Sequence, residues 1–142
     1  MYLAFKIKAT CFLERLIRFF TDSDAVHCEL VTALHKDQFF GYTSQPLEGV
    51  VKRWYFYDPD EWTFIKIHAD PNDVLSFYEK VKGKKYDYLG CLGFVINVRE
   101  NPNRYFCSEF CAEALSLENP SSYTPGRLME YFENLKCRDT ES

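Results

Sequence analysis

The stretch Arg104-Tyr-Phe-Cys-Ser-Glu-Phe-Cys-Ala-Glu-Ala-Leu115 places Cys107 where an extended segment turns into an amphipathic helix. The first N–H groups of a helix have no partner within the helix, and the helix dipole makes this end positive. Both effects favour a thiolate over a thiol, and the same N–H groups can hold an oxyanion. Cys107 is therefore a candidate nucleophile, which would need a base elsewhere in the chain.

The composition predicts one globular domain with a sizeable core. The chain has 142 residues, of which 46% are hydrophobic and 18% aromatic, so it can bury a core without disulfides or a structural metal. We expect this domain to span residues 1–136 and the tail at 137–142 to be disordered. The aromatic excess hints at an apolar cleft.

Charge and cysteine usage exclude several classes of protein. A net charge of −4 with no long Lys/Arg run argues against a nucleic-acid partner. No signal peptide and no run of about 20 apolar residues is found, so we expect a cytoplasmic protein without a transmembrane segment. The six cysteines are then expected to be free thiols, and without a C-x-x-C pair neither a zinc ribbon nor a thioredoxin-type site is favoured.

Hydrophobic periodicity predicts an α+β fold, with an antiparallel meander of short strands and helices packed on one side. Thr10 is the expected N-cap of the first helix, Asp70 caps the second, and Thr124 and Pro125 begin the last. The expected strands are residues 2–8, 26–33, 38–43, 50–57 and 62–68. The expected helices follow residues 10, 70, 106 and 124, and one more is expected over residues 88–98.

His27 is the candidate base, in Ala25-Val-His-Cys-Glu-Leu30. Residues two apart on a strand share a face, so Glu29 can orient the imidazole and stabilise the imidazolium. Each signal is weak alone, because a cysteine at a helix start and a histidine on a strand are more often packing residues. A helix-borne cysteine facing a strand-borne histidine is, however, the arrangement of a papain-like site.

Cys111 follows Cys107 by one helical turn, so a metal shared with His27 or Cys28 has to be considered. Packing beneath the nucleophile is the favoured interpretation, because structural zinc sites use tighter cysteine spacings. We therefore expect no metal and no cofactor.

The chain contains, in this order, the short motifs Val26-His-Cys-Glu-Leu30, Gly49-Val-Val51, Lys85-Tyr-Asp-Tyr-Leu-Gly90, Tyr105-Phe-Cys-Ser-Glu109 and Thr124-Pro125. Over about residues 22 to 135 this ordered set resembles the circularly permuted NlpC-type papain-like amidases, the YiiX/YaeF-like group. In that family the histidine precedes the cysteine, as His27 precedes Cys107 here. The resemblance implies a permuted papain-like fold, Cys107 as nucleophile and His27 as base, and it suggests a link to phage-encoded members.

The resemblance also implies an oxyanion site near a tyrosine hydroxyl, for which Tyr86 is the candidate, with Ser108 in the first turn of the cysteine's helix. Glu29 is the expected third catalytic residue, with Ser44 or Thr43 as alternatives, since no acid occurs on the next strand.

The predicted function is a cysteine hydrolase of peptidase or amidase type. Its substrate would be a peptide, a cell-wall amide or a lipid acyl group. Two alternatives remain: an acyltransferase that uses the same Cys/His site, and a catalytically inactive binding module of viral origin.

Overall fold

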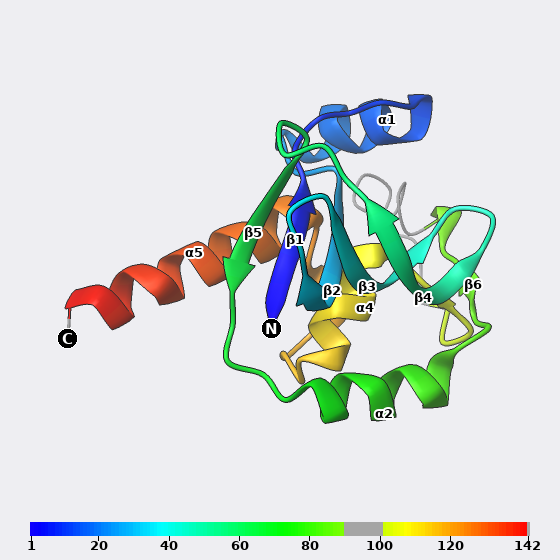
Figure 1. Ribbon diagram of the computed structural model, residues 1–142. Coiled ribbons are helices and arrows are strands. Elements are labelled where there is room, and N and C mark those ends of the chain that lie inside the picture. Colours follow the sequence, from blue (N-terminus) through cyan, green and yellow to red (C-terminus); the bar gives the residue numbers. More distant parts are fainter. Residues whose placement is uncertain (90–100, 142) are drawn as a thin grey trace.

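Five strands form an antiparallel sheet in the order β4-β3-β2-β1-β5, and helices accompany it (Figure 1). The computed structural model describes residues 1–89 and 101–141. The fold is therefore α+β, as predicted. The elements are β1 (Tyr2–Lys6), α1 (Phe12–Thr21), β2 (His27–Leu34), β3 (Gln38–Gln45), β4 (Gly49–Phe56), β5 (Trp62–Lys66), α2 (Pro71–Val81), β6 (Lys85–Tyr86), β7 (Arg104–Tyr105), α4 (Cys107–Ala114), a 3-10 helix (Pro120–Ser122) and α5 (Pro125–Glu141).

The meander predicted from the sequence exists only for β2, β3 and β4, which pair in chain order. β5 instead pairs with β1 on the far side of the sheet. β1 pairs with β2 along one edge, so its other edge is available to β5. Hydrogen bonds from Ile7 N to Glu61 O (2.8 Å) and from Ile67 N to Met1 O (3.1 Å) extend the β1–β5 ladder at its two ends. β1 is therefore the interior strand that joins β5 to the meander.

The two faces of the sheet are packed differently. α4 lies behind β2 and β3 in Figure 1, and on this side Cys28 and Leu30 join the main core with Phe110. The other side carries a second cluster around Val31 and Phe39. All described members of that cluster come from strands or their ends: Tyr2, Ala4, Val31, Leu34, Phe39, Tyr55, Tyr57, Trp62 and Phe64.

The helix boundaries confirm some capping predictions and correct others. The Asp70 carboxylate caps α2 by accepting from Asn72 N at 2.8 Å, as expected. The N-cap of α1 is Cys11 rather than Thr10, because the backbone N–H of Thr10 donates to Glu14 Oε2.

The chain's last residues also differ from expectation. α5 begins at Pro125 as predicted but continues to Glu141, so residues 137–141, which were expected to be disordered, are helical. A helix was expected over residues 88–98. Only its first two positions belong to the described residues, because residues 90–100 lie outside them. Within the described ranges no helix is both long enough and apolar enough to cross a membrane.

A short parallel pair of strands leads into α4. β6 pairs with β7 through Lys85 opposite Arg104 and Tyr86 opposite Tyr105, and Asp87 N donates to Tyr105 O at 3.0 Å. The extended segment before Cys107 was expected from the sequence, whereas β6 was not. This pairing fixes the direction from which the chain enters α4.

Candidate active site

Cys107 is the first residue of α4 and is fully buried. Phe106 precedes it as the N-cap in an extended conformation, with φ −82° and ψ 155°. The Phe106 N–H donates back to Glu109 Oε2 at 3.4 Å, which stabilises the first turn. The thiol therefore lies at the positive end of the helix, as the sequence predicted.

The structure places His27, the first residue of β2, close enough to Cys107 for each residue to shift the pKa of the other. Burial alone would raise the pKa of Cys107, but hydrogen bonds with Cys28 and His27 and the charge of His27 lower it to about 5. Burial alone would lower the pKa of His27, whereas the Cys107 charge and hydrogen bonds with Cys107 and Glu29 raise it to about 10. Each group thus stabilises the charged form of the other, as in a thiolate–imidazolium pair.

Glu29 is the acid beside the imidazole. Its Oε1 lies 3.1 Å from His27 Nε2. The alternative Thr43 is farther away, with Oγ1 3.5 Å from Nε2, and its hydroxyl donates to Cys28 O at 2.8 Å. The other alternative, Ser44, donates to Tyr105 O at 2.7 Å. Among the three candidates, Glu29 makes the shortest contact with His27.

The Glu29 carboxylate is enclosed, since the residue is 1% exposed. Its Oε2 has no hydrogen-bond partner within the described part of the chain. Burial raises the pKa of Glu29 above its usual value, against the opposing effects of His27 and of the Arg53 charge. The hydrogen bond of this carboxylate is therefore directed to His27.

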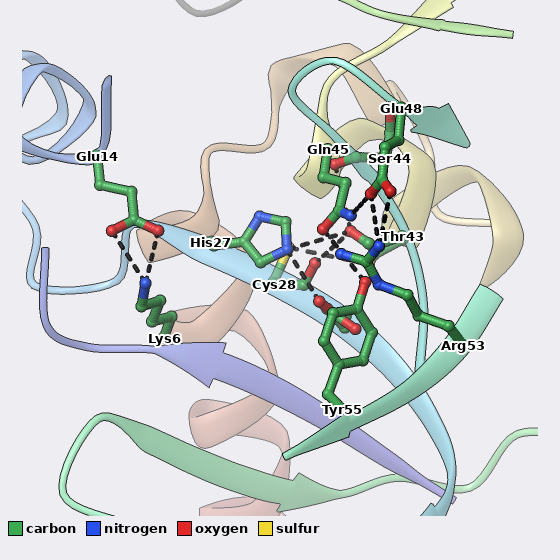
Figure 2. Close-up of polar contacts among 12 residues, drawn as sticks. Lys6, Glu14, His27, Cys28, Thr43, Ser44, Gln45, Glu48, Arg53 and Tyr55 are labelled. Carbon is green, nitrogen blue, oxygen red and sulfur yellow. Dashed lines mark hydrogen bonds and ion pairs between the residues drawn. The ribbon is translucent and has the colours of Figure 1, made fainter. Parts of the chain in front are cut away.

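A polar cluster on β3, β4 and the turn between them lies beside His27 (Figure 2). The Arg53 guanidinium donates to Glu48 at 2.7 Å and lies 4.6 Å from the centre of the Tyr55 ring. The Tyr55 hydroxyl donates to Gln45 Oε1 at 3.2 Å. Burial, followed by the charge of Glu29, raises the pKa of Tyr55 above its usual value.

Three thiols meet at the junction of β2 and α4. Cys28 and Cys111 are buried with their Sγ atoms 3.8 Å apart, and Cys28 also contacts Cys107. Burial raises the pKa of Cys28 well above its usual value, so it stays a thiol able to donate. Cys111 thus packs beneath the nucleophile, as the sequence analysis favoured.

The two oxyanion candidates, Tyr86 and Ser108, are both buried. Tyr86 is buried, and its ring centre lies 5.8 Å from that of Phe106, next to the nucleophile in sequence. The Ser108 hydroxyl donates to Tyr123 O at 2.5 Å. Ser108 can therefore contribute its backbone N–H to an oxyanion site, while its side chain ties α4 to the segment before α5.

Sequence reasoning missed Gly41, Arg53 and the contact of Cys28 with the nucleophile. A glycine inside a strand often marks a close approach by another group, and this signal was available at Gly41. Arg53 and Cys28 depend on the strand register, which the sequence did not specify.

The described residues contain no group of three or more His, Cys, Asp or Glu side chains suited to hold a metal ion. Neither a model of a known protein family nor any curated protein sequence matches this chain. Its chemistry therefore has to be inferred from the arrangement of Cys107, His27 and Glu29.

Proposed function

We propose that the protein is a cysteine-dependent hydrolase that cleaves an amide or ester bond through a thioester on Cys107. The observation that carries the proposal is the contact between a thiol at a helix N-terminus and a histidine that is itself paired with a buried carboxylate. Nucleophile, base and orienting group are the three parts that this chemistry requires.

In the proposed reaction the Cys107 thiolate attacks the carbonyl carbon of the substrate. Backbone N–H groups at the start of α4 hold the resulting oxyanion, as helix N-termini do in other acyl-transfer sites. The His27 imidazolium protonates the leaving amine or alcohol as its bond to carbon breaks. His27 then takes a proton from water, which attacks the thioester and releases the acid and the thiolate.

Because Glu29 contacts His27 Nε2, the other ring nitrogen, Nδ1, would be the one that exchanges a proton with Cys107. The His27 side chain keeps 13% of its surface exposed, whereas Cys107 is fully buried. The substrate would therefore approach from the side of the imidazole. Trp62 stands there, with its ring centre 6.1 Å from that of His27.

The resemblance to permuted NlpC-type amidases agrees with this assignment, since the histidine strand precedes the cysteine helix in the chain. Peptides, cell-wall amides and lipid acyl groups all offer the carbonyl that the reaction needs. The free thiols among the described residues suit a reducing compartment such as the cytoplasm.

Iodoacetamide labelling at mildly acidic pH, followed by peptide mass spectrometry, tests the proposal. Cys11 and Cys137 are exposed and serve as internal references, because access alone would favour them over Cys107. An activated Cys107 should react faster than both, and a His27→Ala variant should remove this preference.

Thiolate ultraviolet absorbance gives a second measurement that needs no access to the thiol. The difference between the wild type and a Cys107→Ala variant should show ionisation near pH 5 rather than near 9. Ionisation near the ordinary cysteine value would contradict catalysis and favour a binding module. Transfer of an acyl group from Cys107 to an amine or alcohol in preference to water would identify an acyltransferase instead.

A further inference from the structure

The Glu29 carboxylate occupies the space that a side chain at position 41 would need. A Cβ built on Gly41 would overlap Glu29 Oε2 and would lie 3.3 Å from Glu29 Cδ and 2.9 Å from Phe39 Cε2. The φ of Gly41 is not in the left-handed region, so the backbone does not itself demand glycine. The requirement for glycine at this position is therefore one of space.

The strand register explains why Gly41 meets the acid. Gly41 on β3 is opposite Val31 on β2 and opposite Arg53 on β4. Glu29 lies two residues before Val31 on the same face of β2, so its side chain lies across β3 at the glycine. The carboxylate is thus held between the imidazole on one side and bare backbone on the other.

We propose that Gly41 is a positioning residue of the catalytic centre: the open space at this position lets Glu29 lie against His27, and His27 in turn supports the Cys107 thiolate. The inference rests on the proposed function, since it concerns the same three groups. A methyl group at position 41 would push the buried carboxylate away from Nε2, and the core offers it no described second partner.

The charged and titratable groups that act on Glu29 come from several elements. They are His27 on the same strand, Arg53 and Tyr55 on β4, and Cys107 on α4. Arg53 partly offsets the cost of burying the carboxylate, so a displaced Glu29 would also change its distance from this cation.

A double-mutant cycle between Gly41→Ala and Glu29→Ala tests the inference, with Cys107 thiolate absorbance as the readout. Gly41→Ala alone should raise the midpoint of thiolate formation by about one pH unit, a tenfold loss of thiolate in mildly acidic solution. In the Glu29→Ala background the same substitution should cause no further loss. An equal loss in both backgrounds would overturn the inference, because Gly41 would then act without the acid.

Two further variants separate positioning from general overpacking. Glu29→Asp withdraws the carboxylate by one methylene, so in the Gly41→Ala background it should recover part of the thiolate. Gly126→Ala on α5 is the matched control, since its Cβ would overlap the Ser23 side chain. It should leave the thiolate midpoint unchanged.

If Gly41→Ala does not fold, the outcome is still decisive. Folding of the Gly41→Ala/Glu29→Ala double variant would support the conflict with the carboxylate. Failure of both would show that the overlap with Phe39 dominates and would overturn the inference. A wild type without thiolate at mildly acidic pH would contradict the proposed function itself, whereas a thiolate insensitive to Gly41→Ala would contradict only this inference.

Discussion

His27 Nε2 lies 3.1 Å from Glu29 Oε1, and only one residue separates the two along β2. The period of two along a strand brings both side chains to one face without any contribution from distant parts of the chain. The proposed base and its orienting acid are therefore assembled locally, whereas α4 brings the proposed nucleophile from much later in the sequence. This division suggests separate tests of each part.

The Cys107–His27 pair should make the stability of the protein depend on pH, with one contribution from each residue. The His27 pKa rises from 6.5 unfolded to about 10 folded, so its stabilising contribution declines as pH increases between these values. The Cys107 pKa falls from 9.0 unfolded to about 5 folded, so its contribution grows as pH increases between these values. The contribution of the pair to the free energy of unfolding should rise between about pH 5 and pH 6.5, stay level to about pH 9 and fall toward about pH 10.

Urea unfolding at a series of pH values, for the wild type and for Cys107→Ala, measures this dependence. The difference between the two curves isolates the pair, because other titrating groups contribute to both. A difference that is independent of pH would show that the thiol and imidazole are not charged together.

Glu29→Gln should raise the midpoint of Cys107 thiolate formation. The substitution preserves the size of the side chain but weakens the contact between Glu29 Oε1 and His27 Nε2, and a less firmly oriented imidazolium stabilises the thiolate less well. We expect a shift of about one pH unit, equal to a tenfold change in thiolate fraction. Thiolate absorbance measures it, and an unchanged midpoint would remove Glu29 from the site.

Ser108→Ala should lower the free energy of unfolding without changing the midpoint of Cys107 thiolate formation. The hydroxyl donates to Tyr123 O at 2.5 Å, and leaving that carbonyl unpaired costs about 1–3 kcal/mol. The backbone N–H of residue 108 is retained, so the thiolate midpoint should not move. Normal stability together with lost turnover would instead assign the hydroxyl a direct role at the oxyanion.

Asp70→Ala should destabilise α2 without affecting the site. The carboxylate accepts from Asn72 N at 2.8 Å, and loss of such a cap costs about 0.5–2 kcal/mol. Urea unfolding measures the loss, and Asp70→Asn is the control because asparagine can also cap. Equal destabilisation by both variants would show that the charge matters more than the cap.

The local features of the site could be predicted from the sequence because short patterns encode them. The β-branched, apolar-rich run from Val26 indicated a strand, on which His27 and Glu29 share a face because they are two residues apart, and the amphipathic run after Phe106 indicated the helix that begins at Cys107. Glu29 was preferred over Thr43 or Ser44 because the next strand carries no acid, and Glu29 also lies nearer to His27 than Thr43 does.

The features that escaped prediction depend on which strands become neighbours. Nothing in the residues 62–68 indicates that β5 pairs with β1 rather than β4, because that choice depends on which edge remains open. Gly41 and Arg53 become relevant only once β3 and β4 are in register with β2. The tail from Cys137 was expected to be disordered, yet α5 continues to Glu141.

The interior position of β1 affects how the chain can fold. β1 precedes the other strands of the sheet in the chain, and both of its neighbours, β2 and β5, come later. It must therefore wait for both before all of its backbone groups are paired, and such long-range pairing slows folding because loops have to close first. The hairpin formed by β2 and β3, which carries the base and its acid, can form without β1, so the catalytic strand can be in place before the sheet is complete.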